Sequence, residues 1–255
     1  YGILNDNEGT MLVENSTIKS NSDNKNNAAG NLILRNSTIL SGQLCNIKNG
    51  YIEIDNSNIN IYVRNSSNGK ITIKGENSNI NSINNSNVDG TIEMLDGKVS
   101  NTSGVAVTNY GKFTIYKGEI KALYRSDTSA IYNRANAIMT IKGDTTKVTG
   151  SGNGIKNEGT AIIESGIITG SGSSGIYNTN VLTVGIKDGT VDVKPVVYGK
   201  INGIYNTGTL NFYDGIVEGN ATTSITGKIP SQTEDDCIHV IHKGEYTFDD
   251  GTDEG

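Results

Sequence analysis

Residues 203–219 read GIYNTGTLNFYDGIVEG, and this stretch decides the fold. It opens with the triplet 204–206 (Ile-Tyr-Asn), in which a β-branched residue stands two positions before an asparagine. A short turn with a glycine follows, and then an apolar pair, Leu210 and Phe212, separated by one residue. A second turn leads to a third apolar residue, Val217. Units of this pattern recur through the chain, so the stretch is one copy of a repeat.

The asparagine that ends each triplet, termed the anchor, recurs every ~22 residues. The expected anchors are Asn5, Asn27 (in a weak copy), Asn49, Asn65, Asn85, Asn109, Asn133, Asn157, Asn178 and Asn206. An apolar residue stands two positions before each anchor outside the weak copy: Ile3, Ile47, Val63, Ile83, Val107, Ile131, Ile155, Ile176 and Ile204.

The first position of the apolar pair holds Met11, Leu32, Ile52, Ile71, Ile92, Phe113, Met139, Ala161, Leu182 and Leu210. The second position holds Val13, Leu34, Ile54, Ile73, Met94, Ile115, Ile141, Ile163, Val184 and Phe212. The third apolar position holds Ile18, Ile39, Ile59, Ile80, Val99, Ile120, Val148, Ile168, Val191 and Val217.

A spacing of two places both members of an apolar pair on the same face of a β-strand. One such unit cannot bury that face alone, whereas stacked units bury a continuous column. The sequence therefore predicts an all-β fold, a right-handed parallel β-helix (a solenoid) of about ten coils with about 22 residues in each. We expect residues 1–219 to form the β-helix, and residues 220–255 to form a final partial coil and an acidic C-terminal capping segment.

The anchors and the second turns have a structural interpretation. Stacked amide side chains at a solenoid corner bond to one another and to the turn backbone. Asp96-Gly97, Asp188-Gly189 and Asp214-Gly215 fit tight turns, because glycine adopts positive φ and Asp or Asn tolerates it. In other coils the same turn reads Asn-Ser, at Asn15, Asn36 and Asn56. We therefore expect the anchor asparagines to be structural.

Charge and hydropathy exclude two classes of partner. Residues 1–232 carry 20 basic and 19 acidic side chains, so the body has no basic surplus to hold a nucleic acid. Residues 233–255 hold one lysine and eight acidic residues. No apolar run reaches about 18 residues, which argues against membrane insertion. The chain opens inside a repeat, and we expect a monomeric fragment of a larger protein.

Two segments carry a resemblance to a known class of proteins: GIKNEGTAIIESGIITGSGSSGIYNTNVLTV (154–184) and GIYNTGTLNFYDGIVEGN (203–220). They resemble the imperfect repeats of large bacterial cell-surface proteins of Gram-positive, clostridial-like species. Those repeats are similar to right-handed parallel β-helices of the pectate-lyase-like kind. The resemblance implies an extracellular adhesin-like module that is secreted or attached to the cell wall.

The cysteines and histidines do not indicate a metal or cofactor site. About eight coils separate Cys45 from Cys237, roughly 35–40 Å, whereas a disulfide needs its Cα atoms within about 7 Å. We expect Cys45 to be a small core residue. His239 and His242 with Cys237 resemble half of a metal site, but their alternation with apolar residues favours a strand. No metal and no cofactor is predicted.

A candidate binding site follows from two long connectors, residues 121–130 and 192–203, because insertions in solenoids often carry the function. They contribute Tyr124, Arg125 and Tyr198, with Lys194 and Lys200 beside the last. The connectors flank the outward middle position of the triplets, which holds Tyr132, Lys156, Tyr177 and Tyr205 in the C-terminal half. In the N-terminal half this position holds Leu4, Lys48, Arg64, Asn84 and Thr108. We expect the Tyr-bearing face to bind a glycan or a host surface protein, since tyrosine offers a flat apolar ring and a hydroxyl.

Three functions remain open at this point. The favoured one is a non-catalytic, carbohydrate-binding adhesin. A polysaccharide lyase or glycoside hydrolase is the second, with Glu53 and Glu93, two coils and ~9.6 Å apart, as the candidate carboxylates. A passive structural stalk is the third. The Glu53–Glu93 pair has no neighbouring His or Arg in register, which favours the non-catalytic interpretation.

Overall fold

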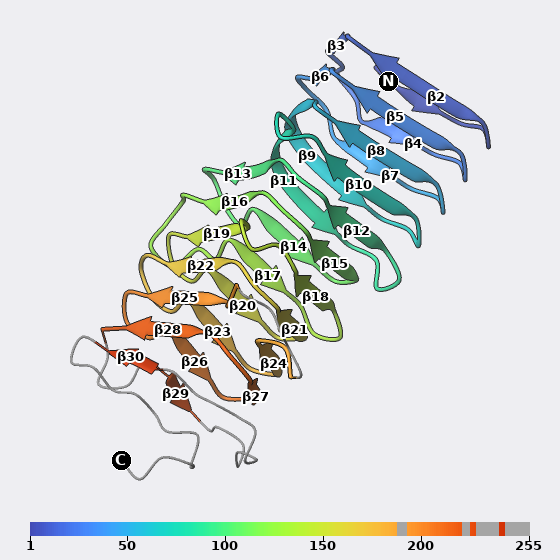
Figure 1. Ribbon diagram of the computed structural model, residues 1–255. Helices are drawn as coiled ribbons and strands as arrows, with labels where there is room; N and C mark the ends of the chain where they lie inside the picture. The colour runs from blue at the N-terminus through green and yellow to red at the C-terminus, as the bar shows by residue number, and fades with distance from the viewer. Residues whose placement is uncertain (188–192, 221–224, 228–239, 243–255) are drawn as a thin grey trace.

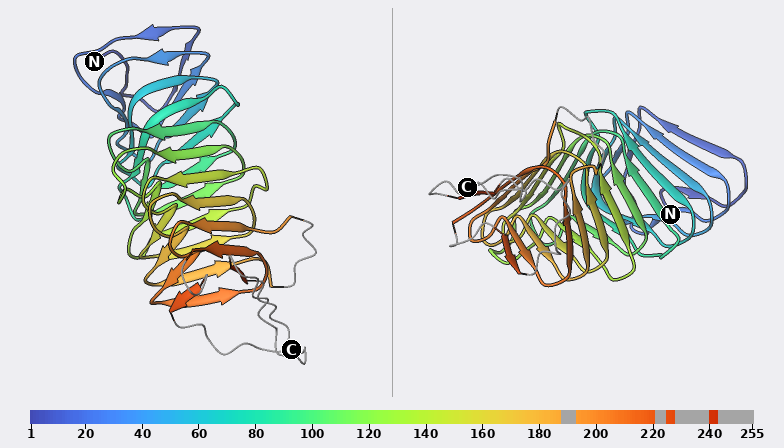
Figure 2. Two further views of the ribbon diagram at one scale, coloured as in Figure 1. Left: turned by 90° about the vertical axis from the view of Figure 1, so that its left-hand side faces the viewer. Right: turned by 60° about the horizontal axis from the view of Figure 1, so that its bottom comes forward.

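The computed structural model describes residues 1–187, 193–220, 225–227 and 240–242. These residues form an all-β solenoid of about ten coils, in which every strand pairs in parallel with the equivalent strand of the next coil (Figure 1). Figure 2 shows the coils stacked along one axis. The described part of the chain has no helix, and so no helix that could cross a membrane. The predicted parallel β-helix is confirmed.

Ten strands that carry the apolar pairs form one sheet, termed the front sheet. Its strands are β2 (Thr10–Glu14), β5 (Asn31–Arg35), β8 (Tyr51–Asp55), β10 (Lys70–Lys74), β12 (Thr91–Met94), β15 (Lys112–Ile115), β18 (Ile138–Ile141), β21 (Thr160–Ile163), β24 (Val181–Val184) and β27 (Thr209–Phe212). Their register aligns like positions in successive coils; Phe113, for example, lies between Ile92 and Met139.

The other twenty strands form two further walls of the coil, joined through the long strands β9 (Asn58–Asn65) and β11 (Asn79–Asn85). The anchor wall contains β1 (Leu4–Asn5), β4 (Asn24–Asn26), β7 (Leu44–Asn46), the second halves of β9 and β11, β14 (Val107–Asn109), β17 (Ile131–Asn133), β20 (Ile155–Asn157), β23 (Ile176–Asn178), β26 (Ile204–Asn206) and β29 (Ile225–Gly227). The third wall contains β3 (Thr17–Ile18), β6 (Thr38–Ile39), the first halves of β9 and β11, β13 (Lys98–Asn101), β16 (Glu119–Ala122), β19 (Lys147–Gly150), β22 (Ile167–Gly170), β25 (Val196–Gly199), β28 (Ile216–Gly219) and β30 (Val240–His242).

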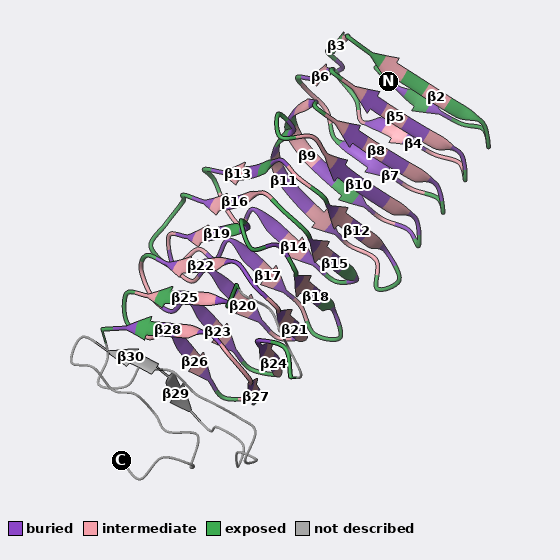
Figure 3. Cartoon of the chain, viewed as in Figure 1, coloured by how far each residue is buried: buried purple, intermediate pink, exposed green. Residues whose placement is uncertain are grey.

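The aliphatic columns predicted from the sequence fill the interior of the solenoid. Figure 3 shows where the buried residues lie along the strands of successive coils. Ile52, Ile71 and Ile141 are completely buried, and they are typical of the front-sheet positions. Only the first coil differs, because no described coil lies before it: Met11, Val13 and Ile18 are half-buried. Stacking therefore supplies the burial that a single coil lacks.

The anchor asparagines form a continuous ladder inside one corner. From Asn5 to Asn206, each side-chain Nδ2 donates to the Oδ1 of the next anchor at 2.6–3.3 Å, and the anchors lie 19 to 28 residues apart. The same amides donate to backbone carbonyls of the following turn, for example that of Gly50. A Cβ at Gly50 would meet the Asn26 amide and the Gly30 carbonyl, so glycine is required there by close approach. The structural interpretation of the anchors is confirmed.

The second turn uses positive φ, as predicted. Asn15, Asn36 and Asn56 adopt φ of 49°, 46° and 44°, while Gly97 and Gly215 adopt 109° and 145°. Asparagine takes this left-handed conformation at less cost than other residues with a Cβ. The predicted turn at Asp188-Gly189 lies outside the described residues.

Two predicted anchors are wrong. The ladder runs through Asn26 and Asn46, whereas the sequence pattern selected Asn27 and Asn49. The register pairs Leu44 with Val63 and makes Leu44 the buried apolar residue of the third triplet, in place of Ile47. A shift of three residues would have taken Leu44 out of the core.

This correction moves Cys45 and Lys48. Cys45 occupies the outward middle position between Lys25 and Arg64, where Lys48 was expected. It is free and buried, at 5% exposure, but it does not join the apolar core cluster. Cys237, the second cysteine of the chain, lies outside the described residues.

The third apolar position of the ninth coil was also misassigned. Val197 fills it, between Ile168 and Val217, and is completely buried. Val191, the predicted residue, lies outside the described residues. The extra residues of this coil therefore come before the strand β25, as the segment 185–195, and only residues 200–203 join β25 to β26.

The C-terminal end continues the stack where it is described. β29 pairs in parallel with β26, and β30 pairs in parallel with β28. The predicted division into a β-helix over residues 1–219 and a partial coil with a cap over 220–255 stays a prediction, because most of residues 220–255 lie outside the described residues. His242 belongs to β30, whereas His239 and most of the predicted acidic cap lie outside the described residues.

Candidate functional site

Four residues of the predicted site lie side by side on the outside of the anchor wall. Tyr132, Lys156, Tyr177 and Tyr205 occupy the middle positions of β17, β20, β23 and β26 and pair in register from coil to coil. We call this set the Tyr–Lys column. Each triplet buries its first and third residues, so its middle residue must point outward, and all four side chains are half-buried.

Two tyrosines of the column stack on each other. The ring centroids of Tyr177 and Tyr205 are 5.0 Å apart, and the ring planes differ by 10°. Each ring uses one face for this contact, so that face is closed to a ligand, whereas the hydroxyl groups are not part of the stack. The pair is held by the register of two neighbouring coils, which fixes its geometry.

The other end of the column is an ionic network. The Tyr132 hydroxyl donates to Glu158 Oε1, and Lys156 Nζ donates to the Tyr132 hydroxyl at 3.1 Å. Lys156 also forms an ion pair with Glu158 at 3.0 Å. Burial opposes the charge of both groups, but these bonds outweigh it: the pKa of Lys156 is raised and that of Glu158 is lowered. Both side chains are therefore charged at neutral pH.

A second set of residues, missed by the sequence reasoning, borders this network. Tyr110, Arg134 and Glu158 each follow an anchor directly, and their backbone N–H groups donate to the anchor carbonyl of the preceding coil. The Arg134 guanidinium lies over the Tyr132 ring at 3.7 Å and near the Tyr110 ring at 5.5 Å. The signal that could have found them is the residue after each anchor, which reads Tyr, Arg and Glu in three successive coils.

Tyr124 and Arg125 lie in the exposed segment between β16 and β17, as expected. Their side chains contact each other, with the guanidinium 5.1 Å from the ring centroid. The backbone carbonyl of Arg125 accepts a hydrogen bond from Ser151 Oγ at 2.6 Å, which joins this corner to the next coil. Within the described residues, neither side chain takes part in the contacts of the Tyr–Lys column.

Tyr198 does not lie in a connector. It is an outward residue of β25 on the third wall, between Thr169 and Glu218, because Val197 fills the core position beside it. The sequence placed Tyr198 in a loop flanking the Tyr–Lys column because it had assigned the core position to Val191. Tyr198 is thus on a different wall of the coil from Tyr177 and Tyr205.

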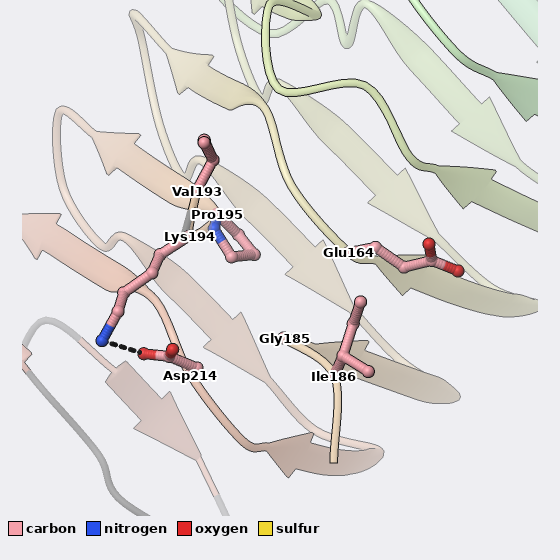
Figure 4. A pocket seen from close by; sticks show the side chains of 7 residues that line it. All are labelled: Glu164, Gly185, Ile186, Val193, Lys194, Pro195 and Asp214. Atoms are coloured by element: carbon pink, nitrogen blue, oxygen red, sulfur yellow. Dashed lines mark ion pairs between the residues drawn. The ribbon is translucent and has the colours of Figure 1, made fainter. Parts of the chain in front are cut away.

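Lys194 belongs to a small pocket at the corner between the front sheet and the third wall (Figure 4). Its Nζ forms an ion pair with Asp214 Oδ1 at 2.9 Å. Glu164, the other carboxylate of the pocket, forms an ion pair with Lys142 at 3.6 Å. Both carboxylates thus have a cation, and the pocket lies on another side of the coil from the Tyr–Lys column.

The candidate catalytic carboxylates lie as predicted, with Glu53 and Glu93 separated by Thr72 on the outside of the front sheet. Each has a lysine: Lys74 lies 2.9 Å from Glu53, and Lys70 lies 2.6 Å from Glu93. Burial disfavours the charge on Glu53, but hydrogen bonds from Lys74 and Tyr51 outweigh it and lower its pKa. Glycoside hydrolysis needs a carboxyl group with a raised pKa as its general acid, so the environment of Glu53 argues against that role.

Comparisons of the chain with models of protein families, with curated proteins and with solved structures found no match.

Proposed function

We propose that this chain is a non-catalytic, adhesin-like module of a secreted or wall-attached bacterial surface protein, and that it binds a glycan along the Tyr–Lys column. The observation that carries the proposal is the alignment of Tyr132, Lys156, Tyr177 and Tyr205 in four successive coils, all half-buried and all pointing outward. Such a row suits an extended ligand that lies parallel to the solenoid axis.

The chemistry of the row supports a polar, partly hydrated ligand. Tyrosine combines an apolar ring with a hydroxyl that donates or accepts a hydrogen bond. The rings are held by neighbouring coils, so little side-chain freedom remains to be lost when a ligand binds. A sugar chain offers hydroxyl groups along its length, which match a row of hydroxyl and ammonium groups.

The test is a glycan array probed with the wild-type chain and with the triple variant Tyr132→Ala, Tyr177→Ala, Tyr205→Ala. The matched control is Thr114→Ala, Thr140→Ala, Thr183→Ala, which removes three outward side chains of the front sheet. We expect the tyrosine variant to lose binding and the threonine variant to keep it, with both folded by circular dichroism. Binding that survives in the tyrosine variant would exclude this site.

A passive stalk is the second candidate, and one observation favours it. Tyr177 and Tyr205 turn one ring face each toward the other, and the ring of Tyr132 has Arg134 and Lys156 over it. Contacts of this kind stabilise a solenoid without any ligand. If the wild-type chain binds no glycan on the array, the stalk replaces the adhesin as the proposed function.

A further inference from the structure

Arg134 is held in place, yet its hydrogen-bond donors are unused. Its guanidinium lies over Tyr132 and near Tyr110. Nε is buried and has no hydrogen-bond partner, and the nearest carboxylate oxygen, Glu158 Oε2, is 4.0 Å from Nη1. A guanidinium has five N–H donors, and within the described residues none of those of Arg134 makes a hydrogen bond.

The charges around Arg134 do not cancel. We call Tyr110, Tyr132, Arg134, Lys156 and Glu158 the Arg134 cluster. It contains two cations and one carboxylate, and Glu158 is engaged by Lys156 and by the Tyr132 hydroxyl. Lys156 uses two of its three donors on Tyr132 and Glu158. One positive charge and several donors are left over at a half-buried position.

These features specify the chemistry of a partner. A guanidinium pairs with a planar or tetrahedral oxyanion through two parallel N–H bonds, and such charge-assisted bonds are stronger than neutral ones. Stacking against aromatic rings fixes the plane of the guanidinium before any ligand arrives. Tyr177, next to Lys156 in the Tyr–Lys column, continues the row away from the cluster.

We propose that the Arg134 cluster binds the carboxylate or sulfate group of an acidic glycan, whose sugar chain lies along the Tyr–Lys column. The proposal rests on the proposed function and narrows its ligand class. The oxyanion accepts hydrogen bonds from the two Nη groups of Arg134 and from the remaining donor of Lys156, whereas the buried Nε faces away from an external ligand. Glu158 keeps Lys156 and Tyr132 in position.

The experiment compares oligosaccharides of one backbone in neutral, carboxylated and sulfated form, with affinities measured by titration calorimetry. We expect the wild-type chain to bind at least one acidic form about tenfold or more tightly than the neutral form, because a hydrogen bond to a charged group contributes about that factor. Arg134→Gln is expected to remove this preference while leaving the neutral form unaffected. Arg134→Lys, which keeps the charge but loses the planar fork, is expected to fall between the two.

Arg64→Gln is the matched control. Arg64 is an outward residue of the same wall, but its Nε already donates to Ser86 Oγ at 3.1 Å, so this variant is expected to bind like the wild type. Thermal unfolding checks that each variant is folded. Equal affinity for neutral and acidic forms, or an acidic preference that persists in Arg134→Gln, overturns the oxyanion site but leaves glycan binding in place. Failure to bind any of the three forms, together with an empty glycan array, overturns both proposals.

Discussion

The Nδ2 atom of Asn109 donates a hydrogen bond to the Oδ1 atom of Asn133 at 2.8 Å, and both side chains are completely buried. Asn109 also donates to the carbonyls of Gly111 and Ile138 and accepts from Asn85. One amide therefore satisfies groups in three coils. Since a buried polar group left without a partner costs free energy, the ladder ties each coil to its neighbours.

Asn109→Ala is expected to lower the free energy of unfolding by about 1–3 kcal/mol, because it leaves buried partners unsatisfied. Urea denaturation followed by circular dichroism measures this. Asn60→Ala, at an exposed position of β9, serves as the control and is expected to change stability by less than about 0.5 kcal/mol. Equal stability of Asn109→Ala and the wild type would show that the ladder contributes nothing to the fold.

The regular coils could be predicted from the sequence, and the errors have a common cause. Leu44 to Asn46 and Ile47 to Asn49 both match the triplet pattern, and the β-branched Ile47 made the second match look better. What decides is the register with Asn26 and Asn65 in the neighbouring coils. A shift along a strand changes which side chains face the core. The free-energy cost of burying the wrong side chains depends on the neighbouring coils, so the sequence of one repeat does not reveal it.

The candidate site was predictable only in part. The Tyr–Lys column follows from the repeat, since its residues share one position in the triplet. Arg134 and Tyr110 lie just outside the triplet, where no apolar period marks which way a side chain points. Tyr198 was misplaced because its coil contains an insertion, and either side of the strand could have held the extra residues.

The turn at Asn36 gives a test of backbone conformation. Its φ is 46°, in the left-handed region, which costs a residue with a Cβ roughly 1–2 kcal/mol but costs asparagine less. Asn36→Ala is therefore expected to destabilise the fold by up to about that amount, whereas Asn36→Gly is expected to be nearly neutral. Thermal unfolding of the two variants provides the comparison. The explanation fails if alanine is tolerated as well as glycine.

Glu158 gives a prediction for pH. Burial raises its pKa, but hydrogen bonds from Tyr132 and Lys156 and the positive charges of Lys156 and Arg134 outweigh burial and hold the pKa below its ordinary value of 4.5 in the folded chain. The stability it contributes is fully present above its unfolded pKa and is lost as pH falls through the folded value. Wild type and Glu158→Gln should therefore differ in free energy of unfolding at pH 7 and converge at acidic pH. A difference that stays constant down to pH ~2 would contradict the assignment.

Cys45 gives a prediction for reactivity. Burial, aided by Asp23 and opposed by Arg64 and Lys25, raises the pKa of its thiol to about 11. Because the thiolate is the reactive form, Cys45 should resist iodoacetamide at pH 8 in the folded chain and react readily in urea. Peptide mapping by mass spectrometry distinguishes its labelling from that of Cys237. Rapid labelling of Cys45 without denaturant would contradict its buried position between Lys25 and Arg64.

The stack of Tyr177 and Tyr205 separates the structural role of the column from its binding role. A double-mutant cycle with Tyr177→Ala and Tyr205→Ala should give a coupling energy of about 0.5–1.5 kcal/mol, the usual range for an aromatic pair. Tyr132 and Tyr177 are separated by Lys156, so the corresponding cycle should be additive within about 0.5 kcal/mol.

Tyr177→Phe with Tyr205→Phe keeps the rings and removes both hydroxyls. This variant is expected to retain the stability of the wild type and to bind glycan more weakly, because it lacks the two hydroxyl groups that would hydrogen-bond to the sugar. Unchanged glycan affinity in the phenylalanine variant would mean that the hydroxyls do not contact the sugar, whatever the stack contributes to the fold.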